Sequence, residues 1–317
     1  MRTALTIGNF DGVHCGHQAM LALLREAARE RGLSPAVLTF EPHPREYFAR
    51  TRGAGVPSRV MTLRDKLRSL KACGVEQVTI MRFDDSVARL DPQDFVRRIV
   101  AGGLGAGLVL VGDDFRFGAR RAGDFDLLAA MGSELGFEVA RMPSFELDGL
   151  RVSSSGLRDA LLGGDMDTVR HYLGRPYCIS GHVVHGRKLG RDLGFPTLNL
   201  RFAQGQPAAG GIFVTQVYGL ADHALPAVAS LGVRPTVEDA GRVLLEVHCL
   251  RWPGHLGADG AYGKIVAVDL LQKIRDEARY EGLDALALAI AGDVSHARAY
   301  FASAHASQAR HITRDRI

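Results

Sequence analysis

The sequence predicts an α/β domain with a parallel sheet in the first half and a small antiparallel β-barrel with terminal helices in the second. In the first half, short aliphatic runs alternate with amphipathic helical stretches, the pattern of right-handed βαβ units. Beyond Gly174-Arg175-Pro176 the hydrophobic period changes to two, and Gly and Pro turns separate the runs. A chain of 317 residues is long enough for two domains, so we place their boundary between residues 174 and 175.

The expected elements follow from these periods. In the first half we expect strands at residues 5–8, 36–40, 77–81, 108–112 and 137–142, and helices at 18–31, 63–73, 92–101 and 125–135. Two short helices, 156–162 and 166–173, precede the boundary. The second half should contain strands at 178–185, 211–219, 224–231, 243–250 and 265–270, then helices at 284–291 and 294–301. Functional groups of the α/β domain should gather where its strands end and its helices begin.

Composition argues against several classes of protein. The 39 Lys and Arg residues against 35 Asp and Glu give a net charge of +4 without a long basic run, which does not favour a nucleic-acid partner. The four cysteines form no CxxC pair, so neither a zinc site nor a disulfide framework is expected, and a reducing cytoplasm fits best. No apolar run approaches the roughly 20 residues of a membrane span. We expect a soluble, unprocessed, cytoplasmic protein whose oligomeric state is open.

The densest motif joins the first expected strand to the first helix and reads GNFDGVHCGH from Gly8 to His17. His14 and His17 are three residues apart across Gly16, so both rings can face one anion at the helix N-terminus, where unpaired N–H groups and the helix dipole favour negative charge. This is the HxGH pattern of nucleotidyltransferases. The alternative is a loop that happens to carry two surface histidines.

Two further segments of the first half can bind parts of a nucleotide or a ring. Residues 152–158 (VSSSGLR) place Ser154, Ser155 and Arg158 at a helix start, an arrangement suited to the outer phosphates of ATP, although such serines are usually only helix caps. Residues 111–118 (VGDDFRFG) end an expected strand. Their aromatic residues, Phe115 and Phe117, can stack on a planar ring beside Asp114.

The second half opens with a glycine-punctuated basic loop, GRKLGRDLGFPTLN, at residues 186–199. Its backbone N–H groups can wrap phosphates, and the residues we assign to this role are Gly186, Lys188, Gly190 and Gly194. Thr197 and Asn199 are two apart in an extended segment and point oxygen atoms to one side, which suits Mg²⁺. The loop has no GK[ST] ending and is not a Walker A loop. A glycine turn followed by an edge strand is the alternative.

Glu246 lies among aliphatic residues in the segment LLEVH at 244–248. If its side chain faces inward, it is a carboxylate with an apolar approach, the kind of group that serves as a general base. A glutamate in an alternating strand is otherwise usually on the solvent face.

Together with residues 39–44 (TFEPHP), these motifs resemble the prokaryotic bifunctional riboflavin kinase/FAD synthetase family over nearly the whole chain. The resemblance implies a Rossmann-like FMN adenylyltransferase domain at 1–174 and a riboflavin kinase domain at 175–317. It implies phosphorylation of riboflavin by ATP to FMN, and then attack of the FMN phosphate on the α-phosphorus of ATP to give FAD and pyrophosphate. Mg²⁺ would assist, and flavins would be substrates and products.

The resemblance also implies roles for individual residues. His14 and His17 would stabilise the triphosphate, Ser154, Ser155 and Arg158 would bind the leaving pyrophosphate, and Glu246 would take the proton of the ribityl 5′-hydroxyl. The remaining assignments are nucleotide binding by Gly8, Asn9, Phe10, Asp11 and Gly16, and flavin binding by Asp114, Phe115, Phe117, Arg234 and Arg275. Ser230 departs from the family, where Asn is usual, and the missing Asn amide is the departure that bears most on flavin or nucleotide binding in the kinase half.

Two other functions fit part of the sequence. A regulatory protein could bind FMN or FAD without turnover, but such a binder has no need of Glu246 or of the metal ligands. A nucleotidyltransferase acting on a sugar or choline phosphate would leave the second half unexplained.

Overall fold

The computed structural model describes residues 2–186, 190, 193–202, 205–233, 243–257 and 259–314, and the side chains of the last helix as far as Ser303. The chain divides into two compact units, one made of Met1–Pro57 with Lys66–Ser154 and the other of Ser58–Asp65 with Ser155–Ile317. The segment Ser58–Asp65 and the two helices before residue 174 thus cluster with the second unit. The boundary between the two functional modules stays a prediction.

The first unit is built on a five-stranded parallel sheet, in agreement with the α/β prediction. Its strands lie in the order β3 (Gln77–Arg82), β2 (Ser34–Glu41), β1 (Thr3–Ile7), β4 (Ala106–Gly112) and β5 (Glu138–Met142). All five predicted strands are confirmed to within a few residues at their ends. The central position of β1 places the loop that follows it in the middle of the sheet's carboxyl edge.

Helices of the first unit match the four predicted ones and add short elements. They are α1 (Cys15–Arg31), α2 (Pro44–Thr51), α3 (Leu63–Ala72), α4 (Asp85–Ala88), α5 (Pro92–Asp94), the π-helix η1 (Phe95–Gly103), the 3₁₀ turn η2 (Ala119–Arg121) and α6 (Phe125–Leu135). The predicted helix at 92–101 is a short α-helical turn that continues as a π-helix. A two-stranded hairpin, β6 (Glu146–Leu147) and β7 (Leu150–Arg151), was not predicted.

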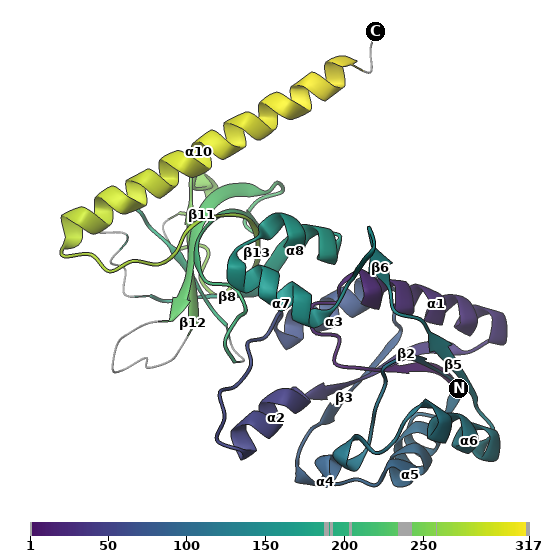
Figure 1. Ribbon diagram of the computed structural model, residues 1–317. Coiled ribbons are helices and arrows are strands. Elements are labelled where there is room, and N and C mark those ends of the chain that lie inside the picture. Colours follow the sequence, from purple (N-terminus) through teal and green to yellow (C-terminus); the bar gives the residue numbers. More distant parts are fainter. Residues whose placement is uncertain are drawn as a thin grey trace. The chain divides into compact units, whose positions relative to one another are not determined.

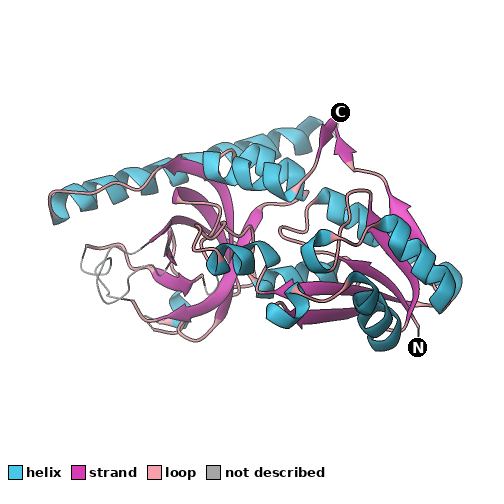
Figure 2. Ribbon diagram, turned by 60° about the horizontal axis from the view of Figure 1, so that its bottom comes forward, coloured by secondary structure: helices cyan, strands magenta, loops and turns pink. Residues whose placement is uncertain are grey.

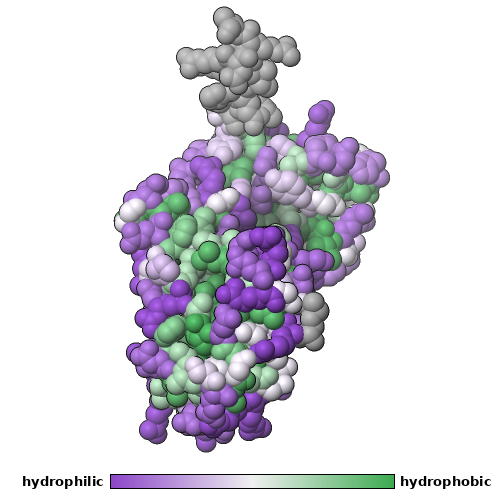
Figure 3. Space-filling view, turned by 90° about the vertical axis from the view of Figure 1, so that its right-hand side faces the viewer, coloured by the Kyte–Doolittle hydropathy of each residue, from purple (hydrophilic) through white to green (hydrophobic). Residues whose placement is uncertain are grey.

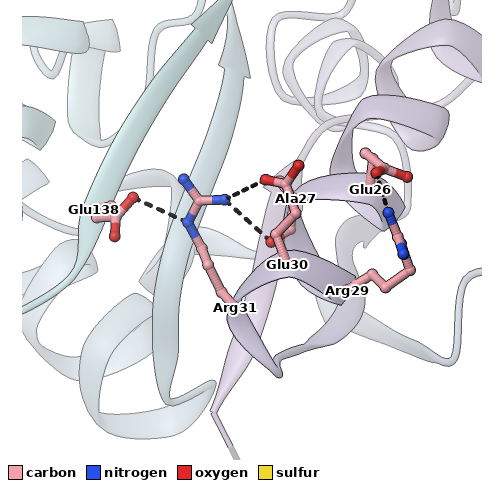
Figure 4. Close-up of polar contacts among 6 residues, drawn as sticks. All are labelled: Glu26, Ala27, Arg29, Glu30, Arg31 and Glu138. Atoms are coloured by element: carbon pink, nitrogen blue, oxygen red, sulfur yellow. Dashed lines mark hydrogen bonds and ion pairs between the residues drawn. The ribbon is translucent and has the colours of Figure 1, made fainter.

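Alternation along β1 sends neighbouring side chains to opposite faces of the sheet. Leu5 and Ile7 join the core that includes residues of η1 and α6, whereas the Thr6 hydroxyl donates to Met20 Sδ on α1 at 3.2 Å. Figure 1 shows these helices around the sheet, and Figure 2 shows the strands and helices in separate colours. At the end of α1, Arg31 Nε donates to Glu138 Oε2 of β5 at 3.1 Å (Figure 4).

The second unit contains a closed antiparallel barrel, as predicted. Its strands run β10 (Gly211–Tyr218), β11 (Leu225–Val233), β12 (Val243–Cys249), β9 (Leu198–Arg201), β8 (Tyr177–Val184) and β13 (Ile265–Arg275), with β13 closing onto β10. Alternate residues of every strand fill one interior core. The strand β9 lies between β12 and β8, so the interpretation of this segment as an edge strand is not supported.

Helices pack on the barrel at two places. The helices α7 (Ser154–Gly163) and α8 (Met166–Leu173), predicted before the boundary, contribute residues to the barrel core, and a 3₁₀ turn, η4 (Gly254–Leu256), lies after β12. The two predicted terminal helices are one continuous helix, α10 (Leu283–Arg314). Val294, Ala297 and Phe301 of α10 cover the outer side of β10 and β11, and this packing favours a helix that continues through Gly292.

Side chains of different polarity are interspersed on the face drawn in Figure 3. Within the described ranges, no helix is both long enough and apolar enough to cross a bilayer.

Candidate active sites

The loop after β1 has an uncommon backbone conformation. Phe10 and Val13 adopt positive φ angles of 48° and 43°, although neither is glycine, and both side chains are almost completely buried. Positive φ is especially rare for a β-branched residue and is typically retained where a site needs a particular loop shape. The loop lies at the carboxyl edge of the sheet, where a ligand is expected.

His14 and His17 contact each other directly. Their rings are stacked, with centroids 3.7 Å apart and an interplanar angle of 19°. His14 is the N-cap of α1, and its Nδ1 accepts a hydrogen bond from the His17 backbone N–H at 3.3 Å. A Cβ atom at Gly16 would come within 3.2 Å of His14 Nδ1, so a side chain there would crowd the cap. The motif therefore aligns two imidazoles at a helix N-terminus, as predicted.

Burial keeps both imidazoles neutral in the absence of ligand. Desolvation lowers the pKa of His14 from 6.5 to about 4. Desolvation lowers the pKa of His17 well below 6.5, and the charges of His14 and Lys66 lower it further. Neutral imidazoles bind phosphate as N–H donors, and a triphosphate at the site would raise both pKa values.

Two buried polar atoms in this loop have no hydrogen-bond partner in the described part of the chain. They are Asn9 Oδ1 and His17 Nδ1. A buried polar atom without a partner is costly unless a ligand or water satisfies it. Both atoms lie in the predicted nucleotide loop and are consistent with a polar ligand there.

The serine segment meets the loop through Ser154. Its hydroxyl donates to Asp11 O at 2.9 Å, across 143 positions of sequence, so the first residue of α7 is fixed to the nucleotide loop. Asp11 itself is buried, and a Cβ atom at Gly8 would lie 3.1 Å from Cε2 of the Phe10 ring. Ser155 and Arg158 belong to the second unit, where Arg158 Nε donates to Ser58 O at 2.8 Å. Their phosphate-binding role stays a prediction.

Lys66 was not predicted as a site residue. It is only 3% exposed, and its charge acts on His17. The surrounding sequence, LRDKLRSLKA, has the period of an amphipathic helix with several charges. Nothing in that pattern distinguishes the one lysine that is buried near the imidazoles.

The aromatic segment after β4 packs partly in the hydrophobic core. Phe117 is 7% exposed, and its ring contacts those of Phe95 and Phe115. Phe115 is partly buried at the edge of the same cluster, and Asp114 is exposed and pairs with Arg151 at 2.9 Å. Of the two phenylalanines, Phe115 has more surface available for a ligand.

In the barrel, three polar residues from three neighbouring strands, Asn199, Glu246 and Ser230, form a row. Asn199 of β9 lies directly opposite Glu246 of β12, and Glu246 lies directly opposite Ser230 of β11. Directly opposite residues of antiparallel strands project to the same face. Because the neighbours of Glu246, Leu245 and Val247, fill the barrel interior, this row lies on the outer face. Glu246 is half-buried there, so the inward orientation on which the sequence interpretation was conditional is not observed, and the carboxylate lies instead between the polar residues Asn199 and Ser230.

The glycine loop approaches this row closely. A Cβ atom at Gly186 would overlap the Asn199 amide and displace it, and one at Gly190 would lie 2.5 Å from the backbone oxygen of Phe195, so Gly190 requires glycine. Asn199 is 6% exposed, and its Nδ2 donates to Thr197 O at 3.4 Å. Gly194 has a positive φ of 83°. Lys188 and Arg234 lie outside the described residues.

Arg275, predicted to bind flavin, forms an ion pair with α10. Its Nε and Nη2 donate to the two carboxylate oxygens of Asp293, at 2.9 and 2.6 Å. Asp293 is 5% exposed, and the pairing raises the pKa of Arg275 above its usual value. The guanidinium therefore joins β13 to α10 in this structure.

An α/β unit with two imidazoles at a helix N-terminus, and a barrel with an amide opposite a carboxylate on its outer face, are features of a two-module transferase that uses nucleotides. A family model described as FAD synthetase matches residues 1–156, and one described as riboflavin kinase matches residues 173–301. The chain belongs to the family of bifunctional riboflavin kinases/FMN adenylyltransferases. The resemblance seen in the motifs is thereby confirmed.

Similar proteins cover almost the full length of the chain. The bifunctional riboflavin kinase/FMN adenylyltransferase of Escherichia coli strain K12 is 44% identical over 94% of this chain and 92% of its own. The protein of the same description from Pseudomonas fluorescens is 44% identical over 95% and 94% of the two chains. A crystal structure described as a macrolide-efflux protein from Streptococcus pneumoniae is 27% identical, covers 94% of both chains and has a TM-score of 0.71.

Proposed function

We propose that this chain phosphorylates riboflavin to FMN in its barrel module and adenylylates FMN to FAD in its α/β module, with ATP as the phosphoryl and adenylyl donor. The observation that supports the proposal is that predicted site residues lie side by side in each half: the stacked rings of His14 and His17 in one, and the paired Asn199 and Glu246 in the other. A protein that only bound flavins would not need either set.

In the adenylyl transfer, the FMN phosphate attacks the α-phosphorus of ATP, and pyrophosphate leaves. The N–H groups of His14 and His17 and the N-terminus of α1 stabilise charge on the triphosphate. Ser154, Ser155 and Arg158 bind the leaving pyrophosphate, while Asn9 and Asp11 maintain the loop. Positioning and charge neutralisation supply the catalysis, with no covalent enzyme intermediate.

In the kinase reaction, the Glu246 carboxylate accepts the proton of the ribityl 5′-hydroxyl as that oxygen attacks the γ-phosphorus of ATP, and ADP leaves. Asn199, directly opposite Glu246, and Thr197, two residues before it, supply an amide oxygen and a hydroxyl, a donor set of hard oxygen ligands that fits Mg²⁺. Mg²⁺ held there would neutralise charge on the ATP phosphates. The backbone N–H groups of Gly186, Gly190 and Gly194 contact the phosphates of ATP.

The flavin sites and the cellular location are part of the same proposal. Phe115 and Asp114 contact the flavin in the adenylyltransferase module, and Phe117 supports Phe115 from the core. The thiols of the four cysteines are unbridged, which fits a reducing cytoplasm.

Incubation of the purified protein with riboflavin, ATP and MgCl₂ tests the proposal directly. We expect FMN to form first and FAD to follow, with ADP and pyrophosphate as the other products, when the mixture is separated by chromatography. A protein that binds flavin but forms neither product would instead be a binder, and adenylylation of a sugar phosphate without FMN formation would indicate a different nucleotidyltransferase.

A further inference from the structure

A carboxylate outside the assigned set lies next to the kinase row. Glu277 follows the end of β13, and its Oε1 accepts a hydrogen bond from Ser230 Oγ at 2.9 Å. Ser230 is the residue directly opposite Glu246. We propose that Glu277 is a positioning residue for the riboflavin kinase reaction, and that it holds residues 276–282 against the outer face of β11, one strand from Glu246. This inference rests on the proposed kinase function.

The path of Glu277 requires the absence of a side chain on β11. A Cβ atom at Gly232 would lie 2.0 Å from Glu277 Oε2 and 2.1 Å from Oε1. Gly232 has no positive φ, so its backbone conformation does not require glycine. The close approach of the carboxylate does, and glycine in a strand interior often marks such an approach. We call Ser230, Gly232 and Glu277 the clasp.

A second anchor lies two residues earlier. The ion pair between Arg275 and Asp293 fixes the end of β13 to α10. With Glu277 held on β11, both ends of the stretch from Arg275 to Glu277 are attached to different elements, and its path passes Ser230, the residue directly opposite Glu246. The clasp also accounts for Ser230. The hydroxyl at this position, where Asn is usual in the family, donates to Glu277.

The clasp acts on the population of the binding-competent form. If residues 276–282 form one wall of the flavin site only when attached, breaking the clasp lowers the fraction of molecules that can bind riboflavin, and apparent affinity falls by that fraction. Saturating riboflavin restores the attached form. The expected signature is therefore a higher KM for riboflavin with kcat nearly unchanged, whereas a group that takes part in the chemistry would lower kcat.

The decisive variant is Gly232→Ala, because the added methyl displaces only the flexible end of Glu277. We expect Gly232→Ala and Glu277→Ala each to raise the KM for riboflavin by about tenfold, the worth of one charge-assisted hydrogen bond, with kcat within about twofold of wild type. Glu277→Gln keeps an oxygen acceptor for Ser230 and should restore most of the affinity. Gly210→Ala is the matched control, since its Cβ would meet only Leu231 O at an ordinary 3.7 Å.

Adenylylation of supplied FMN by the full chain reports on the other module and should not change in any variant. Glu277 is exposed, so we expect its variants to fold. They therefore test the clasp even if Gly232→Ala does not fold. Wild-type protein that forms no FMN would overturn the proposed function and the clasp with it. Wild-type FMN formation with an unchanged KM in Gly232→Ala and Glu277→Ala would overturn the clasp alone, as would a Glu277→Gln variant whose KM for riboflavin is as high as that of Glu277→Ala.

Discussion

The imidazole rings of His14 and His17 stack at 3.7 Å while His14 Nδ1 accepts the backbone N–H of His17. The two rings therefore differ in the nitrogen atom that a ligand can contact. His14 Nδ1 is used in the helix cap, so its Nε2 carries the proton and is the atom available to a ligand. His17 Nδ1 is buried without a partner in the described part of the chain. Each ring thus has a nitrogen atom that can bind a phosphate group.

Replacement of His17 by Ala should lower the rate of FAD formation by about two to three orders of magnitude, the usual effect of removing a donor to developing negative charge. FMN formation from riboflavin should continue at the wild-type rate, since it takes place in the barrel. Both products can be followed in one chromatographic assay. Adenylylation at an unchanged rate in the variant would remove His17 from the site.

The low pKa of His14 makes the stability of the protein depend on pH. In the unfolded chain this imidazole titrates near 6.5, whereas in the folded protein it stays neutral until about pH 4. The unfolded state therefore binds more protons between these values, and stability that is present above pH 6.5 is lost as pH falls toward 4. Over this interval His14 accounts for about 3 kcal/mol of the free energy of unfolding.

Substitution of His14 by Asn tests this dependence, because Asn also caps helices but does not titrate. We expect a shallower fall of the thermal midpoint between pH 6.5 and 4 in His14→Asn than in wild type, and His17 should retain part of the slope. Replacement of the exposed His255 by Asn serves as the control. Identical slopes in all three proteins would contradict the low pKa of His14.

Local patterns were sufficient to predict most of the fold. All five parallel strands follow aliphatic runs whose period is unambiguous, and α6 and α8 begin and end where predicted. The helix α10 was split in two because Gly292-Asp293 interrupts the apolar pattern. In the structure, Asp293 is held by Arg275 and the apolar residues beyond it pack on the barrel, so tertiary contacts override the local break.

The candidate sites were predictable only where their residues are close in sequence. The loop from Gly8 to His17 is one continuous motif, so its geometry follows from a strand, a turn and a helix. The contact between Ser154 and Asp11 joins residues 143 positions apart, and the pairing of Glu246 with Asn199 depends on the register of β12 with β9. Neither can be obtained from periodicity. The burial of Lys66 likewise depends on packing.

Removal of the Ser154 hydroxyl should loosen the nucleotide loop. Ser154→Ala deletes one hydrogen bond to Asp11 O, worth about 1 kcal/mol, and should raise the KM for ATP in adenylylation by about fivefold. The kinase reaction should be unaffected. Ser133→Ala removes a similar serine bond to a backbone carbonyl, that of Ala129, and should change neither reaction. An unchanged KM for ATP in Ser154→Ala would separate this serine from the nucleotide site.

Replacement of Glu246 by Gln should abolish FMN production and leave adenylylation of supplied FMN intact. Gln has the same size but cannot accept the hydroxyl proton, and loss of a general base typically costs about 10²- to 10⁴-fold. Initial rates with riboflavin and with FMN as separate substrates give the two activities. The exposed Asp222 of the same unit, changed to Asn, is the control. Full-rate phosphorylation of riboflavin by Glu246→Gln would place the base elsewhere.

The ion pair between Arg275 and Asp293 offers a test of the predicted flavin role of Arg275. Asp293 is buried, so Asp293→Asn should lower the free energy of unfolding by about 1–2 kcal/mol once the partial exposure of the guanidinium is allowed for. Arg275→Ala should cost a similar amount, and the double variant should cost less than the sum, because the two changes remove one interaction. Denaturant titration measures all three.

The exposed pair Arg29 and Glu26 provides the comparison, and Glu26→Gln should leave the free energy of unfolding nearly unchanged. If Arg275 serves mainly to anchor α10, Arg275→Ala and Asp293→Asn should affect the KM for riboflavin to the same extent, because both release the same junction. A large rise in KM in Arg275→Ala alone, with additive effects on stability, would instead assign the guanidinium to the flavin.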